Sequence, residues 1–209
     1  MLLEQRHQTI LDYLIQKKSV TVSELSSQFF VSEATIRRDL TAMEKQGLLK
    51  RSHGGAVLFE SNNDETSLLV REQKNVQEKQ KIAQLALDFI SSNSTVFMDS
   101  SSTTGMIIPF LKQYKFLTVI TNGLKNALAL SQHNAIKTYI TGGFVNPQST
   151  SAVGSDSIDY IKNMNAQVAF ISCGGISCKN GVTDAAFEQA RLKKAMLNHV
   201  KTKVLLCDS

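Results

Sequence analysis

Six consecutive residues near the middle of the chain combine one carboxylate with five small hydroxyl side chains: Asp99, Ser100, Ser101, Ser102, Thr103 and Thr104. They directly follow a short apolar run, 96–98. Hydroxyl groups that leave water must find hydrogen-bond partners, and a row of small donors after a strand suits a loop that holds an anion such as phosphate. The alternative interpretation is an ordinary solvated loop.

Other small or acidic residues occur at comparable places. Each of the following comes after a predicted strand or beside a predicted helix start: Asn122, Gly142, Gly143, Gly174, Gly175, Asp184 and Glu188. Glycine lets the backbone approach a ligand closely, and carboxylates can accept hydrogen bonds from a ligand. Taken one by one, the glycines could be plain turns, Asp184 a helix N-cap, and Glu188 an ion-pair partner of Arg191.

The elements that must position these residues alternate regularly. From residue 74 onward the pattern predicts helices over 74–91, 104–114, 123–132, 154–164 and 184–199. Between them it predicts strands over 95–98, 117–121, 136–140, 167–172 and 203–207. Apolar strands separated by amphipathic helices indicate a Rossmann-like α/β domain with a parallel sheet covered on both faces. Ligands of such sheets bind beyond the carboxyl ends of the strands, where the candidate residues lie.

The first part of the chain has a different pattern. It predicts helices over 4–17, from Thr21 or Ser23 to about Phe29, and from the cap Ser32 to about residue 46. Two β-prone arms within 48–59 then flank Gly54 and Gly55 and indicate a hairpin. This order is that of a small winged helix-turn-helix domain, over 1–58. Residues 59–73 begin polar and aperiodic and are predicted to be a linker to a domain over 74–209.

Residues 32–40, SEATIRRDL, are the candidate DNA-reading segment. Ile36 and Leu40 fall on the apolar stripe that faces the core, so we expect the polar side chains on the other side of the helix to be exposed and able to contact DNA. The candidates are the helix residues Ser32, Glu33, Thr35, Arg37 and Arg38, and the hairpin residues Lys50, Arg51 and His53. Helix-start residues and Arg suit base edges, and hairpin cations suit phosphates. The alternative is a three-helix bundle with a solvated basic face.

Bulk charge does not decide between these interpretations. The net charge is +5, but residues 1–60 hold eight Lys or Arg and seven Asp or Glu, a net +1 that leaves +4 for the rest. The three cysteines, Cys173, Cys178 and Cys207, form no C-x-x-C pair and are expected to be reduced thiols rather than a metal or redox site. No signal peptide or membrane-spanning run is visible, so we expect a cytoplasmic protein.

The segments SEATIRRDL and GLLKRSHGGAVL, within residues 1–58, resemble the signature of the DeoR-type bacterial transcriptional regulators. The pieces MDSSSTT (98–104), VITNG (119–123), ITGG (140–143), SAVG (151–154) and GVTD (181–184) resemble their C-terminal domain, which is similar to sugar-phosphate isomerases. The resemblance implies an oligomeric repressor of a sugar-metabolism operon, with operator DNA and a phosphorylated sugar as partners. It implies no enzymatic activity, cofactor or metal.

Two departures from the family pattern bear on the site. Ser101 stands where the family usually has glycine. The chain ends at LLCDS, whereas the family typically continues with a serine-lysine and a further segment, which implies truncation and the loss of a ligand-facing lysine. Two alternatives stay open. One is an isomerase-like enzyme with Asp99, Asp184 and Glu188 as acid and base. The other is a second domain that serves oligomerisation alone.

Overall fold

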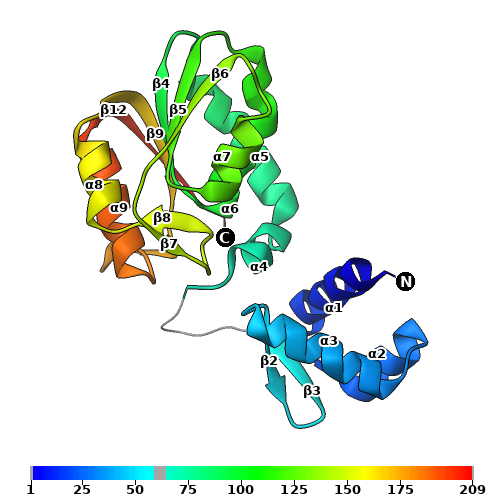
Figure 1. Cartoon of the computed structure of the whole chain (residues 1–209). Coiled ribbons are helices and arrows are strands. Elements are labelled where there is room, and N and C mark those ends of the chain that lie inside the picture. Colours follow the sequence, from blue (N-terminus) through cyan, green and yellow to red (C-terminus); the bar gives the residue numbers. More distant parts are fainter. Residues whose placement is uncertain (1, 59–64, 209) are drawn as a thin grey trace. The chain divides into compact units, whose positions relative to one another are not determined.

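The computed structural model describes residues 2–58 and 65–208 and divides into two compact units (Figure 1). The first unit is Met1–Lys74 and the second is Asn75–Ser209. Each has its own hydrophobic core, as expected when the apolar pattern changes its period between two parts of a chain. No helix within the described ranges has the length and apolar character needed to cross a membrane.

The first unit is a winged helix-turn-helix, as predicted. Its elements are α1 (Leu3–Lys17), β1 (Ser19–Thr21), α2 (Val22–Phe29), α3 (Glu33–Lys45), β2 (Leu49–Ser52) and β3 (Gly55–Leu58). The helix starts follow from local chemistry. Thr21 and Glu24 form a reciprocal capping box at α2, and the Ser32 hydroxyl accepts from the Thr35 amide over 3.2 Å at α3. The predicted stripe Ile36, Leu40 and Met43 is fully buried.

The hairpin of this unit turns one residue earlier than the sequence suggests. Ser52 pairs with Gly55, so His53 and Gly54 form the turn and Gly55 belongs to β3. Gly55 is needed for close approach, since a Cβ at this position would lie 2.1 Å from the Val20 carbonyl oxygen. That carbonyl belongs to β1, an unpredicted three-residue strand that pairs with β3 and completes the sheet β1-β3-β2.

The predicted linker contains a helix in its described part. Residues 59–64 lie outside the described residues, but α4 (Leu68–Gln73) follows them. Its Val70 is fully buried in the same core as Ile10 and Leu14 of α1. Leu68 and Val70 are both buried, and their burial compensates for ordering this short segment.

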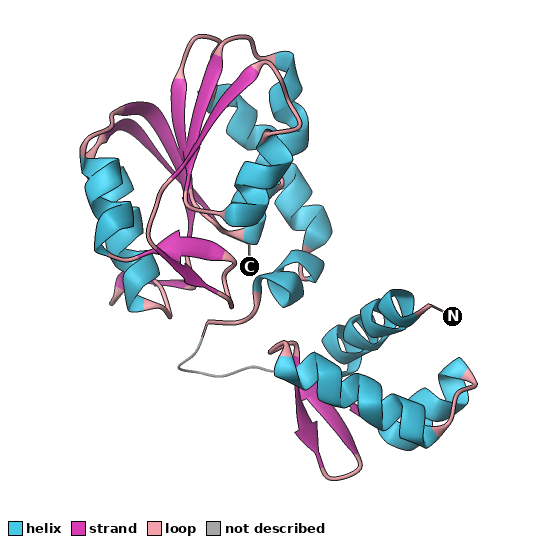
Figure 2. Ribbon diagram, in the orientation of Figure 1, coloured by secondary structure: helices cyan, strands magenta, loops and turns pink. Residues whose placement is uncertain are grey.

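The second unit is a five-stranded parallel sheet with helices on both faces, as predicted (Figure 2). Its strands are β4 (Thr95–Met98), β5 (Leu117–Thr121), β6 (Ile136–Ile140), β9 (Ala166–Ser172) and β12 (Val200–Leu206), in the order β12-β9-β4-β5-β6. The chain moves outward from β4 through β5 to β6 and then returns to the other side of β4. The strand order therefore reverses between β4 and β9, which is where open α/β sheets bind their ligands.

The sheet lies between two hydrophobic cores, one on each face. One lies under α5 (Val76–Ala86), the 3-10 helices η1 (Leu87–Phe89) and η2 (Ile108–Gln113), and α7 (Leu124–Leu130). The other lies under α8 (Ser155–Lys162) and α9 (Phe187–Asn198). The predicted helix over 104–114 is in fact the single turn α6 (Ser102–Gly105) followed by η2, whose second residue is Pro109. Proline lacks the amide hydrogen that a continuous α-helix needs at such a position.

Two small hairpins were not predicted. β7 (Phe144–Asn146) pairs with β8 (Ser151–Val153), and β10 (Gly175–Ser177) pairs with β11 (Gly181–Thr183). They follow β6 and β9, at the carboxyl edge of the sheet. Ala152 of β8 accepts a hydrogen bond from Asn122, directly after β5. Asp184, directly after β11, pairs with Lys193, which also lies 3.4 Å from Asp99, directly after β4.

Candidate functional site

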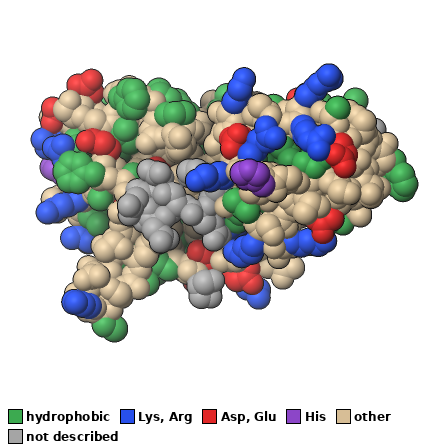
Figure 3. All heavy atoms as spheres, turned by 90° about the horizontal axis from the view of Figure 1, so that it is seen from below, with side chains coloured by type: hydrophobic (Ala, Val, Ile, Leu, Met, Phe, Trp, Pro, Cys, Tyr) green, Lys and Arg blue, Asp and Glu red, His purple; other side chains and the backbone are tan. Residues whose placement is uncertain are grey.

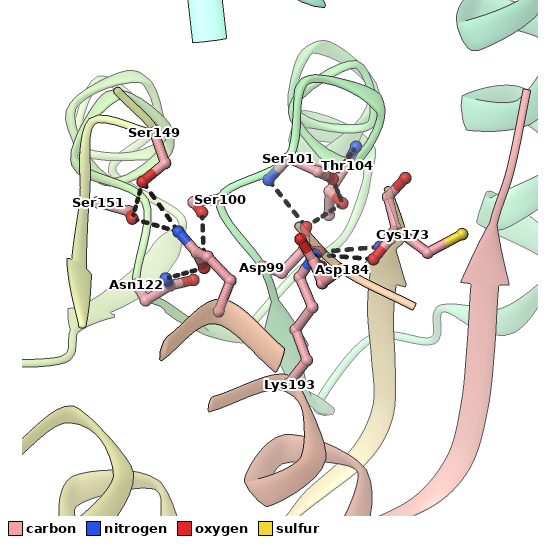
Figure 4. A network of polar contacts seen from close by, with 12 residues as sticks. Asp99, Ser100, Ser101, Thr104, Asn122, Ser149, Ser151, Cys173, Asp184 and Lys193 are labelled. Atoms are coloured by element: carbon pink, nitrogen blue, oxygen red, sulfur yellow. Dashed lines mark hydrogen bonds and ion pairs between the residues drawn. The ribbon is translucent and has the colours of Figure 1, made fainter. Parts of the chain in front are cut away.

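Asp99, the residue directly after β4, is the centre of a buried polar network (Figure 4). One carboxylate oxygen, Oδ1, accepts from the Ser101 amide over 2.9 Å and from the Thr104 hydroxyl over 2.5 Å. The other, Oδ2, accepts from the Ser172 amide over 2.8 Å. The Ser101 hydroxyl also caps α6 by accepting from the Thr104 amide over 3.2 Å. This cap holds Ser101 and Thr104 close together, and both donate to Asp99.

Lys193 of α9 supplies the opposite charge. Its ammonium lies 3.4 Å from Asp99 Oδ2, pairs with Asp184, and donates to the Ser172 carbonyl over 2.9 Å. Burial alone would raise the pKa of Asp99, but the charge of Lys193 and the hydrogen bonds from Ser101, Thr104 and Ser172 outweigh it and hold this pKa below its usual range. Burial would lower the pKa of Lys193, but Asp99 and Asp184 outweigh it and raise this pKa.

A second, uncharged cluster lies beside the first and is organised by Gln189, one helical turn before Lys193. Its side-chain nitrogen donates to the hydroxyls of Ser149 and Ser151 over 2.9 and 2.8 Å. Its oxygen lies 3.5 Å from the Ser100 hydroxyl and 3.4 Å from the Asn122 nitrogen. A neutral amide thus occupies the centre of four polar side chains from the segments after β4, after β5 and around β8.

The segment after β5 is pressed onto the segment after β4. A Cβ on Gly123 would lie 3.1 Å from Ser100 Cα, so glycine permits this contact. Asn126 of α7 reinforces it by donating to the Asp99 carbonyl over 2.9 Å. The same loop holds Asn122, whose side-chain nitrogen also donates to the Ala152 carbonyl over 3.1 Å.

Several polar groups near these strand ends have no partner among the described residues. The buried side-chain oxygens of Asn122 (Oδ1), Thr141 (Oγ1) and Glu188 (Oε2) are unpaired there. The amide groups of Ser102 and Thr103, in the first turn of α6, likewise have no acceptor within the described ranges. Buried polar groups are normally hydrogen-bonded, so unpaired donors and acceptors together are typical of a site that a polar ligand completes.

The structure therefore brings together some of the predicted effector residues and separates others. Six of them belong to the Asp99–Lys193 network or to the Gln189 cluster: Asp99, Ser100, Ser101, Thr104, Asn122 and Asp184. Gly142 instead accepts from Ser157 through its carbonyl, and Gly174 and Gly175 start the β10–β11 hairpin. Gly143 is close to Val153 and Ser157. Asp184 is no helix cap, since α9 begins three residues later. That any of these predicted residues binds an effector stays a prediction.

Sequence reasoning missed four side chains of the networks: Ser149, Ser151, Gln189 and Lys193. The signal for the last two was available, because Gln189 and Lys193 are four residues apart on a predicted helix and so share a face. The lysine that the sequence comparison expected to be lost is one that follows LLCDS in the family; Lys193 is a different lysine, on α9, and it was not among the predicted site residues. No group of three or more His, Cys, Asp or Glu side chains in the described part of the chain could hold a metal ion.

The candidate DNA-binding helix is α3. Arg38 is exposed and has no ion-pair partner in the described ranges, whereas Arg37 pairs with Glu33 over 2.6 Å. Arg37 and Arg38 line a shallow depression with Thr41, Ala42 and Lys45. Ser32 is exposed at the helix start. Thr35 is half-buried and its hydroxyl lies 3.0 Å from that of Ser32.

The wing is tied to the same helix. The Arg51 amide donates to Glu44 over 2.7 Å, and its guanidinium donates to the Thr41 hydroxyl over 3.0 Å. Lys50 and His53 are exposed. Figure 3 shows Lys and Arg side chains interspersed with Asp and Glu rather than gathered into one block. This agrees with the small net charge of the first sixty residues, so DNA affinity would depend on a few well-placed cations.

Comparison with known proteins assigns both units. Residues 6–62 match the DeoR-like helix-turn-helix domain, and residues 74–209 match the DeoR C terminal sensor domain. Among solved structures, a ribose 5-phosphate isomerase from Plasmodium falciparum matches at a TM-score of 0.44 and 12% identity, over 62% of this chain and 49% of that chain.

Curated relatives are similar over nearly the whole chain. The regulator GolR of Listeria innocua is 35% identical over 98% of this chain and 80% of its own length. The L-fucose operon activator of Haemophilus influenzae is 31% identical over 98% and 82%. The glycerol-3-phosphate regulon repressor of Escherichia coli is 28% identical over 98% and 81%. With both domains matched along its length, this chain belongs to the DeoR family of transcriptional regulators.

Proposed function

We propose that this protein is a cytoplasmic repressor of a sugar-metabolism operon, and that a phosphorylated sugar bound in the second unit lowers its affinity for operator DNA. The observation that carries the effector half is the set of unpaired groups at the carboxyl ends of β4 and β5. Donors and acceptors both stand unpaired there, which fits a ligand that is part anion and part polyol.

The charge distribution suggests how such a ligand would be oriented. Asp99 and Asp184 outnumber Lys193, so an anionic phosphate would be repelled from this side. The neutral side offers the Ser100 hydroxyl and the amides of Ser102 and Thr103. We place the phosphate there and the sugar hydroxyls against the unpaired Asn122 oxygen and the carboxylate side. Gln189 now occupies part of this space and would have to move.

A thermal-shift panel tests the effector assignment. Phosphorylated sugars should raise the unfolding midpoint of the second unit, while the same sugars without phosphate should not. Ser100→Ala should weaken the effect by about tenfold in ligand affinity, the loss of one charge-assisted hydrogen bond. Ser155→Ala, at an exposed position of α8, is the matched control. No stabilisation by any phosphosugar would favour a second unit that serves oligomerisation alone.

The DNA-binding half is supported by the exposure of Arg38 on α3 and by the wing held beside it. Arg38→Ala should weaken operator binding by about 1–3 kcal/mol and spare effector binding. Arg191→Ala, in the second unit, serves as the control. Operators can be selected from genomic fragments and titrated by gel shift. Unchanged affinity in that titration would remove Arg38 from the interface. A homodimer or tetramer would let two recognition helices meet adjacent half-sites.

An isomerase-like enzyme is less well supported by the same geometry. A general base works best when its pKa is close to the working pH, and the pKa of Asp99 is held low. Both Asp99 and Asp184 are already committed to Lys193. Incubation with phosphosugars followed by NMR distinguishes the two functions, because sustained conversion would require an enzyme and a repressor would only bind.

A further inference from the structure

The carboxyl ends of β9 and β12 bring two cysteines together beside the candidate site. The two strands are parallel neighbours, and their last paired residues are Ser172 and Leu206. Cys173 and Cys207 are the next residue on each strand. Their sulfur atoms lie 3.2 Å apart, and both are free thiols of intermediate burial. The fold therefore places thiols 34 residues apart in sequence in direct contact.

We propose that Cys173 and Cys207 form a reversible disulfide, a redox-sensitive modification site at the edge of the sensor sheet. Neighbouring strands are about 4.8 Å apart, which falls within the Cα separation that a disulfide tolerates. The Cys173 side chain points away from the Asp99 network (Figure 4), so the bridge forms without displacing that network. In compartments that keep thiols reduced, disulfides that form are usually transient and redox-sensing.

The chemistry balances with a peroxide or a low-molecular-weight disulfide as oxidant. With hydrogen peroxide, one of the two sulfurs attacks as a thiolate at one oxygen to give a sulfenic acid, and the departing hydroxide takes up a proton to become water. The other sulfur then displaces hydroxide to form the S–S bond, and its own proton completes a second water. Each sulfur loses one electron and the peroxide gains two. Burial, and next the contact with Cys173, raise the pKa of the Cys207 thiol to about 11.

Ser172 connects this pair to the polar network. Its amide donates to Asp99 and its carbonyl accepts from Lys193, and the next residue along the chain is Cys173. A disulfide between Cys173 and Cys207 would fix the end of β9, and with it the Ser172 backbone groups that bind Asp99 and Lys193. The sulfur contact and the register of β9 with β12 are the same whatever ligand the second unit binds.

Peptide mapping of the whole chain tests the proposal. Cleavage after Lys and Arg puts Cys173 and Cys178 in one peptide, 163–179, and Cys207 in 204–209. Cys178 is exposed, so Cys178→Ser removes the ambiguity without disturbing the pair. This variant is equilibrated in mixtures of reduced and oxidised glutathione, alkylated and mapped by mass spectrometry. We expect a peptide of 163–179 linked to 204–209 that disappears on addition of dithiothreitol.

Two controls make the result decisive. Adding Cys207→Ser to Cys178→Ser should abolish the link and leave at most a glutathione adduct on Cys173. In concentrated urea, linking should require at least a tenfold higher ratio of oxidised to reduced glutathione, because the fold no longer holds the thiols together. The proposal is overturned if the folded protein gives only glutathione adducts at the highest ratio. It is equally overturned if linking occurs as readily in urea.

Discussion

The groups around Asp99 stabilise its negative charge, whereas its burial by itself would favour the neutral carboxyl. It is fully buried, and three donors together with the Lys193 ammonium keep it ionised. The Ser101 amide and the Thr104 hydroxyl, in the loop that the sequence suggested as a phosphate site, donate to this carboxylate. Part of the hydroxyl-rich loop thus holds Asp99 in place. That the loop, including the buried Ser100, Ser102 and Thr103, contacts a ligand stays a prediction.

The depressed pKa of Asp99 predicts a pH-dependent effect of Asp99→Asn. A lowered pKa gives stability that is present above the unfolded value of about 3.9 and is lost as the pH falls through the lower folded value. At pH 7 we expect the variant to unfold more easily by at least about 2 kcal/mol. As the pH falls below the unfolded value of about 3.9 and through the lower folded value, the difference should shrink, because the native carboxyl then becomes neutral as well.

Urea titrations of the second unit at pH 7 and at a second, acidic pH below the unfolded value of about 3.9 measure this difference. Asp156→Asn is the control, since Asp156 is an exposed carboxylate on α8. It should cost little at either pH. An Asp99→Asn penalty that is the same at both values would mean that the lost interaction is not with the ionised carboxylate.

Among helices and strands, the end of α2 places a phenylalanine in a backbone conformation that favours glycine. Phe30 terminates the helix in the left-handed conformation, with φ of 53°, and its ring is 94% exposed. Glycine adopts this conformation without the steric cost that other residues incur. Phe30→Gly should therefore stabilise the first unit by about 0.5–1 kcal/mol. Phe30→Ala removes the ring but keeps the strain, so it should change stability little; equal effects of the two substitutions would contradict this explanation.

The wing depends on a close contact between β3 and β1. A Cβ on Gly55 would meet the Val20 carbonyl oxygen at 2.1 Å and Thr21 Cα at 3.0 Å, and both are backbone atoms. Gly55→Ala should destabilise the first unit by about 1–3 kcal/mol and weaken operator binding with it. The control Gly142→Ala has open space for its Cβ. Thermal unfolding and gel-shift titration of both variants check the prediction, and a stable Gly55→Ala wing would show that β1 can move aside.

Sequence patterns predicted the elements well where periodicity was strong and poorly where contacts decide. The five parallel strands and the stripe Ile36, Leu40 and Met43 were foreseen because their apolar spacing is regular. β1, β7, β8, β10 and β11 are three residues long, too short for any period to register. β1 pairs with β3, which lies far along the chain, and the other four pair in two local hairpins whose partner strands are equally short. Lys193 was missed because no loop motif contains it, and only the fold brings α9 to the end of β4.

For the whole chain, the two matched domains make a thermodynamic link testable. If the effector lowers operator affinity by some factor, then operator DNA must lower effector affinity by the same factor. A coupling of about 1–3 kcal/mol corresponds to a change of roughly 5- to 150-fold. We expect a phosphosugar found in the thermal-shift panel to bind that much more weakly in the presence of saturating operator duplex.

Calorimetric titration of that sugar into free and operator-bound protein measures the factor, and gel shifts with and without saturating sugar should give the same factor for operator affinity. Arg38→Ala provides the internal control, since it should lower operator affinity without changing the coupling factor. Lys193→Met should do the opposite: it removes the cation that joins α9 to Asp99 and should alter coupling while leaving the α3 surface intact. Equal effector affinity with and without operator would show that the two units bind independently, and the repressor mechanism would then need a different link.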